Sequence, residues 1–116
     1  MTWQSSKSAI DAILATQPAD QQFHYPIRHG TMRVGLYVPS GIDDQTPHDQ
    51  DELYIIASGT GWFVNGEERI AFAPHDVLFV KAGIAHRFED FSDDFSTWVI
   101  FWGPKGGNWL DHLKGI

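Results

Sequence analysis

The sequence contains no cysteine. Disulfide bonds, thiolate metal sites and cysteine nucleophiles are therefore excluded, and any metal ion must be held by nitrogen and oxygen ligands. Basic residues are also scarce, because 8 Lys and Arg stand against 15 Asp and Glu, which gives a formal net charge of −7. Nucleic acids and anionic membranes repel such a surface, so we expect neither as a partner.

Long apolar runs are missing as well. No segment reaches the ~20 apolar residues that a membrane-spanning helix needs, and the N-terminus lacks the basic start and apolar stretch of a secretory signal. We therefore expect a cytoplasmic protein. Its 116 residues, 14% of them aromatic, fit a single domain over 1–116, with a core barrel over about 31–102.

One short helix is expected near the N-terminus. Ile10, Ile13 and Leu14 fall at the i, i+3, i+4 spacing of an amphipathic helix. Ser8 and Asp11 are spaced like a capping box, and Pro18 closes the segment.

The rest of the chain has the texture of an all-β protein. β-branched and aromatic runs alternate with Gly, Pro and Asp, and the connections are too short for crossover helices, which predicts an antiparallel sandwich or small barrel. Asn65-Gly66 is expected to form a type I′ hairpin turn, and the tail 108–114 a closing helical turn or two. The expected strands lie within residues 31–38, 52–58, 61–65, 68–73, 76–82, 86–90 and 96–102.

The chemistry of the chain centres on His48 and Glu52. In a continuous strand, at ~3.3 Å per residue, they would lie roughly 13 Å apart, too far to share one ion. The intervening residues Asp49-Gln50-Asp51 favour a turn or bulge instead, which would bring the imidazole and the carboxylate together.

His86 is expected to join this pair, because it opens another strand after the turn signal at Gly83. Two histidines and one carboxylate from neighbouring strands form a facial triad that suits Fe(II), Mn(II) or Zn(II) and leaves coordination positions open. His24, His29, His75 and His112 have no such partners and are expected to be surface or capping residues.

The spacing around these residues resembles that of the cupin superfamily. The first cupin motif, G-x5-H-x-H-x3,4-E-x6-G, is similar to the stretch that holds His48, Glu52 and Gly59. The second motif, G-x5-P-x-G-x2-H-x3-N, is similar to 75–90, with Gly83 and His86 in place. The resemblance implies a cupin-type double-stranded β-helix, or jelly-roll barrel, with a divalent metal ion at His48, Glu52 and His86.

The sequence departs from these motifs at several positions. Thr46 stands where the family has its first histidine, which reduces the ligand set to three residues. In the second motif His75 replaces the opening glycine, Lys81 the proline and Asp90 the final asparagine. We expect Lys81 to point outward.

A substrate pocket is expected beside the metal, formed by Thr46, Gln50, Tyr54 and Arg33. Strand alternation puts Tyr54 on the same face as Glu52. If the face of 31–38 that carries Arg33 lines the cavity, its guanidinium can anchor an anion. The acidic pair Asp43-Asp44 is expected to lie in a solvated loop, or else to narrow the mouth of the pocket against anionic substrates.

These features leave several functions open. The first is a metal-dependent enzyme that acts on a small organic molecule, of dioxygenase or isomerase/lyase type as the cupin resemblance implies. The alternative is a non-catalytic module that binds or senses a small ligand, with or without metal, and a purely structural dimer is a third. Because both faces of 96–102 are apolar, a homodimer is expected.

Overall fold

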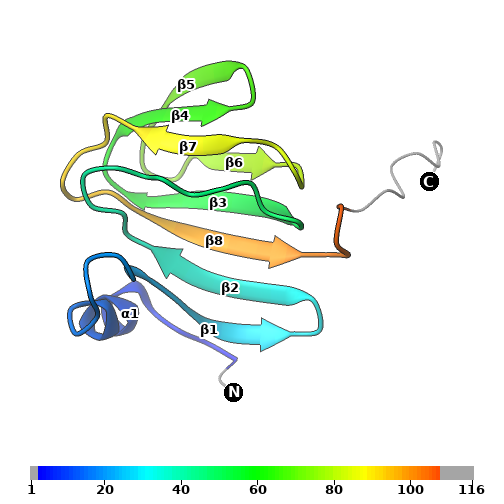
Figure 1. Cartoon of the computed structure of the whole chain (residues 1–116). Helices are drawn as coiled ribbons and strands as arrows, with labels where there is room; N and C mark the ends of the chain where they lie inside the picture. The colour runs from blue at the N-terminus through cyan, green and yellow to red at the C-terminus, as the bar shows by residue number, and fades with distance from the viewer. Residues whose placement is uncertain (1–2, 108–116) are drawn as a thin grey trace.

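The computed structural model describes residues 3–107, so the predicted helical turns at 108–114 and His112 lie outside the described residues. The chain folds as a jelly-roll β-sandwich preceded by one helix (Figure 1). Its elements are α1 (Lys7–Leu14), β1 (Phe23–His29), β2 (Met32–Tyr37), β3 (Asp51–Ser58), β4 (Gly61–Asn65), β5 (Glu68–Phe72), β6 (Val77–Val80), β7 (His86–Glu89) and β8 (Ser96–Trp102). Within 3–107 no helix is long and apolar enough to cross a membrane.

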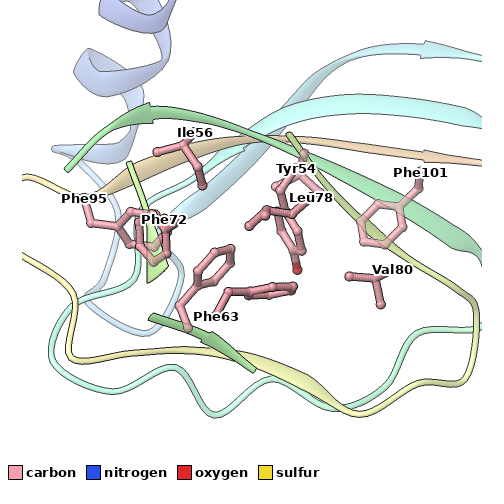
Figure 2. Packing of buried hydrophobic residues seen from close by; sticks show 10 residues of the cluster. Tyr54, Ile56, Phe63, Phe72, Leu78, Val80, Phe95 and Phe101 are labelled. Carbon is pink, nitrogen blue, oxygen red and sulfur yellow. The ribbon is translucent and has the colours of Figure 1, made fainter. Parts of the chain in front are cut away.

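Two antiparallel sheets face each other across the core. One is five-stranded, in the order β1-β2-β8-β3-β6, and the other is three-stranded, in the order β5-β4-β7. Figure 2 shows the aromatic rings that fill the space between them. Phe88 lies at the centre, with ring centroids 4.7 Å from Phe63, 4.8 Å from Tyr54 and 4.7 Å from Phe95. Such ring pairs contribute beyond their buried area, so a small domain gains a dense core from few residues.

Alternation along β3 separates the core from the outer face, as predicted. Glu52, Tyr54 and Ile56 are buried between the sheets, whereas Leu53 and Ile55 are half-buried on the other face. On β3 the inward side thus carries a carboxylate and a phenol among apolar residues.

The sequence prediction missed β1. In this segment the apolar Phe23, Tyr25 and Ile27 do occupy alternate positions, but Pro26 stands in its middle and argues against a strand. β1 is an edge strand, and its pairing with β2 is irregular between His24 and Ile27, where Pro26 lies. Proline lacks an N–H and is tolerated at strand edges and bulges. Pro26, which argues against a strand in the sequence, therefore lies where the pairing of β1 with β2 is irregular.

The helix is confirmed, but its predicted cap is wrong. Ser6 is the N-cap and its hydroxyl accepts a hydrogen bond from the Ala9 amide, so Ser8 and Asp11 lie inside the helix. Ile10 and Leu14 are buried against Leu36 on the outer face of the five-stranded sheet. The helix therefore covers the face opposite the cavity.

The hairpin after β4 is also confirmed, with a different turn. Asn65 pairs with Glu68, so the two central residues are Gly66 and Glu67. Only Gly66, at φ 62°, has a positive φ there, whereas a type I′ turn needs positive φ at both central residues. The type I′ assignment is wrong because Asn65 still belongs to the strand.

Two departures from the second motif occur at residues with a positive φ angle. His75 and Asp90 are the non-glycine residues with positive φ within 3–107, at 75° and 49°. They stand where the cupin motif has Gly and Asn, the residues that tolerate this left-handed conformation best. Lys81 is exposed, as predicted.

Candidate metal centre

The backbone bends between His48 and β3, as the sequence predicts. Asp49 and Gln50 form the bend, and His48 Nε2 lies 3.9 Å from Glu52 Oε1. The bend is fixed by backbone hydrogen bonds, because the His48 carbonyl accepts from Gly83 and the Asp49 carbonyl from Gly106, each at 2.7 Å. The loops before β7 and after β8 therefore hold the first ligand beside the second.

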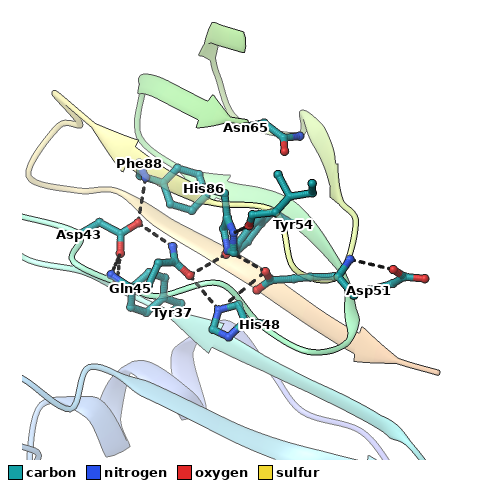
Figure 3. Close-up of polar contacts among 12 residues, drawn as sticks. Tyr37, Asp43, Gln45, His48, Asp51, Tyr54, Asn65, His86 and Phe88 are labelled. Atoms are coloured by element: carbon teal, nitrogen blue, oxygen red, sulfur yellow. Dashed lines mark hydrogen bonds and ion pairs between the residues drawn. The ribbon is translucent and has the colours of Figure 1, made fainter. Parts of the chain in front are cut away.

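His86 lies on the opposite sheet and points at the same place (Figure 3). Its Nε2 is 3.0 Å from Glu52 Oε1, and both side chains are almost completely buried. The His86 Nδ1 donates to the Ile84 carbonyl at 2.8 Å, so in the neutral ring Nε2 carries no hydrogen and can only accept. A backbone acceptor of this kind orients the histidines that bind metals.

When His86 is neutral, two buried acceptor atoms face each other at this point with no donor between them. Glu52 Oε1 and His86 Nε2 are the buried side-chain polar atoms left unsatisfied within the described part of the chain. Such groups are costly unless something compensates them. With His48 they place ligand atoms within 4.8 Å of one another, a donor set that fits Fe(II), Mn(II) or Zn(II). The residues present therefore fit the divalent ion that the sequence predicts.

The two histidines differ in their protonation. Burial lowers the pKa of His48, and this outweighs the opposing effect of the Glu52 carboxylate. Burial also disfavours the charged form of His86, but hydrogen bonding to Glu52 and to the Ile84 carbonyl prevails, so the pKa of His86 is raised. A metal ion bound here would meet a neutral His48 and compete with a proton at His86.

Gln45 belongs to the site, although the sequence analysis did not find it. Its Oε1 lies 3.1 Å from His48 Nε2 and accepts a hydrogen bond from the Tyr54 hydroxyl at 3.1 Å. Burial, followed by the charge of Glu52, holds the pKa of Tyr54 far above its usual value, so this hydroxyl remains a donor. The only sequence signal for Gln45 is its place next to Thr46, the position of the missing histidine.

Asp43 fixes the orientation of Gln45. The carboxylate accepts hydrogen bonds from the Gln45 side-chain amide at 2.6 Å, the Tyr37 hydroxyl at 2.7 Å and the Phe88 amide at 2.8 Å. It is only 4% exposed, so the prediction of a solvated loop is wrong for Asp43, whereas Asp44 is exposed. A carboxylate only accepts, so Gln45 must turn its NH₂ toward Asp43 and its oxygen toward His48.

A cavity of about 670 Å³ opens beside the three ligands. That volume suits one small organic molecule. The His48 side chain is 33% exposed while those of Glu52 and His86 are closed off, so open coordination positions would face this space. The lining includes Tyr25, Arg33, Tyr37, Gln45, His48, Glu52, Tyr54 and Phe101.

Arg33 and Tyr54 line this cavity, as the sequence analysis expects, but two other pocket residues do not. The Arg33 guanidinium lies 4.5 Å from the centroid of Phe101, and the His48 ring lies 5.0 Å from the same centroid. Gln50 accepts from Arg33 at 3.2 Å and donates to the Gly103 carbonyl, outside the cavity lining. Thr46 is exposed and does not reach the cavity.

Sequence comparison identifies the family to which this site belongs. The family of AraC-like ligand binding domains matches residues 41–113, which is more than half of the chain. The chain belongs to this cupin family. An uncharacterized protein of Streptomyces coelicolor is 38% identical over 81 residues, which cover 68% of this chain and 77% of that protein.

Solved structures show the same cupin fold. KdgF from Halomonas sp. superposes with a TM-score of 0.65 at 11% identity, over 77% of this chain and 87% of KdgF. A cupin-2 domain protein from Shewanella frigidimarina gives a TM-score of 0.61 at 14% identity, over 80% of this cupin and 90% of that chain. At these identities the likeness concerns the fold alone, and the predicted cupin jelly roll is confirmed.

Proposed function

We propose that this cupin binds one divalent metal ion through His48, Glu52 and His86 and acts on a small organic molecule in the adjacent cavity. The observation that supports this most is the pair of buried, unsatisfied atoms Glu52 Oε1 and His86 Nε2. With a neutral His86 both atoms can only accept, so a proton or a cation must lie between them. When bound, the ion would supply Lewis-acid or redox chemistry, as in a dioxygenase or an isomerase/lyase.

Arg33 offers a place for an anionic group in this cavity, whose lining otherwise carries the acidic residues Asp20, Asp44 and Glu52. Arg33 is the one Lys or Arg among the cavity-lining residues, and within 3–107 it forms no ion pair. Its hydrogen bond goes to the neutral amide oxygen of Gln50, and its flat face is occupied by Phe101. A guanidinium held in this way can still bind a carboxylate or phosphate. We place such a group at Arg33 and the reacting end of the molecule near His48.

Metal analysis tests the proposal. Protein purified without chelators is expected to contain about one Fe, Mn or Zn per chain. His86→Ala is expected to lower metal affinity at least about tenfold, since one ligand is lost, whereas the exposed His75→Ala is the matched control and leaves it unchanged. Wild-type protein that takes up no divalent ion in a titration would refute the proposal.

Non-catalytic ligand binding is the second candidate function. The matching family is described as a ligand binding domain, which favours a module that holds the molecule without converting it. Turnover separates the two functions. Oxygen uptake by the iron form and product analysis of the Mn and Zn forms, over a panel of small organic acids, would detect an enzyme, whereas tight binding without turnover indicates the binding module.

We further propose that the chain forms a homodimer through the outer face of the five-stranded sheet. Phe79 and Val77 are 50% and 59% exposed there, next to Trp102, whose ring centroid lies 6.2 Å from that of Phe79. Exposed apolar patches commonly mark interfaces. Phe79→Glu is expected to convert a dimer into a monomer in sedimentation velocity, and a monomeric wild type would contradict the proposal.

A further inference from the structure

The position of Gln45 relative to His48 raises the question of a fourth ligand. In the metal-free protein Gln45 Oε1 is an acceptor, so the hydrogen on His48 Nε2 lies between these two atoms, which are 3.1 Å apart. Glu52 Oε1 and His86 Nε2 are separated by almost the same distance, 3.0 Å. Two atoms that each bind one ion at about 2.1 Å, on bonds about 90° apart, are separated by about 3.0 Å. Both pairs therefore have the spacing of neighbouring ligands.

The orientation of the amide also suits a ligand. Asp43 takes the Gln45 NH₂ group at 2.6 Å, which prevents the amide from turning its nitrogen to the site. The Tyr54 hydroxyl uses one lone pair of Oε1, and a carbonyl oxygen has two. The second lone pair remains available on the side of His48.

We infer that Gln45 Oε1 supplies the fourth metal ligand, in place of the motif histidine that Thr46 replaces. This inference rests on the proposed metal function. The replacement preserves the charge of the site, because an amide oxygen is neutral like the imidazole it replaces. The fourth ligand comes from residue 45 rather than 46 because Thr46 is exposed, whereas Asp43 fixes the Gln45 side chain toward the cavity.

Cobalt titration tests the inference, because Co(II) reports both affinity and coordination number through its visible absorption. Gln45→Leu has nearly the same size but no oxygen, and it is expected to lower Co(II) affinity at least about tenfold and to change the absorption spectrum.

Two controls separate a ligand from a structural residue. Thr46→Ala changes the position that the motif assigns to a histidine, and is expected to keep affinity and spectrum within about twofold of wild type. Tyr54→Phe removes the hydrogen bond to Oε1 but not the oxygen, and is expected to keep the wild-type spectrum. Urea unfolding of each metal-free variant shows whether it is folded.

The outcomes are distinct. If wild type binds Co(II) but Gln45→Leu gives the same affinity and spectrum, Gln45 is not a ligand and the three-residue site stands. The same conclusion follows if Thr46→Ala weakens binding as much as Gln45→Leu. If wild type binds no Co(II), the proposed function itself fails.

Discussion

Asp43→Asn is expected to be among the most damaging isosteric changes in this protein. Oδ1 accepts from the Tyr37 hydroxyl and the Gln45 backbone amide, and Oδ2 accepts from the Gln45 side chain and the Phe88 amide. An asparagine replaces one oxygen by NH₂, so whichever way it turns, two of these donors face another donor. Hydrogen bonds to a charged group contribute about 1.5–3 kcal/mol each, so the loss is about 3–6 kcal/mol.

Urea unfolding of the metal-free protein, followed by tryptophan fluorescence, measures this loss. The neighbouring exposed Asp44→Asn is the control and is expected to stay within about 0.5 kcal/mol of wild type. Tyr37→Phe removes a single donor and is expected to cost about 1.5–3 kcal/mol, which provides a folded variant if Asp43→Asn does not fold. An Asp43→Asn protein within about 1 kcal/mol of wild type would refute the reasoning.

Three further changes probe the cavity and the turns. Arg33→Met is expected to weaken the binding of a small organic acid to the metal-loaded protein at least about tenfold, while metal affinity stays unchanged. Calorimetry with oxalate, and with a neutral diol as the control, measures this loss. Equal oxalate binding by the variant and the wild type would show that Arg33 does not bind the anion. Burial, with the Glu52 charge, raises the pKa of Tyr25 to about 12, so the folded state favours the neutral phenol. The unfolded chain loses this proton near pH 10, and the free energy of unfolding therefore falls by about 3 kcal/mol between pH 10 and 12. Tyr25→Phe is expected to flatten this fall in urea unfolding at each pH, and an unchanged fall would show that other groups cause it. His75→Gly, at φ 75°, is expected to raise the unfolding free energy by about 0.5–1 kcal/mol, and a less stable variant would show that His75 makes a contact worth more than the strain.

Much of the fold was predictable because its signals are local. The β-branched and aromatic runs 52–58 and 96–102, together with Gly and Asp between such runs, indicate strands. β1 escaped prediction because Pro26 contradicts the local rules for a strand, although its apolar residues occupy alternate positions, and its pairing with β2 tolerates the proline at an edge. The N-cap and the hairpin turn were each displaced by one or two residues, since several adjacent residues can play the same local part.

The candidate metal ligands were predictable for a different reason. His48, Glu52 and His86 keep the spacing of a motif, and the polar insert after His48 predicts the bend that joins the first two. Gln45 and Asp43 could not be found in this way. Their roles depend on the Phe88 amide of the opposite sheet and on the Tyr54 hydroxyl, which reach them only once the two sheets have packed.

The sequence by itself determined the strands other than β1, the helix and the residue types able to bind a metal, because these depend on neighbours in the chain and on side-chain chemistry. Only the tertiary structure decided which polar atoms converge, which stay buried without a partner, and that Gln45 rather than Thr46 faces the site. Side-chain direction in a loop is set by contacts with distant segments. Here Asp43, buried against β7, determines that direction.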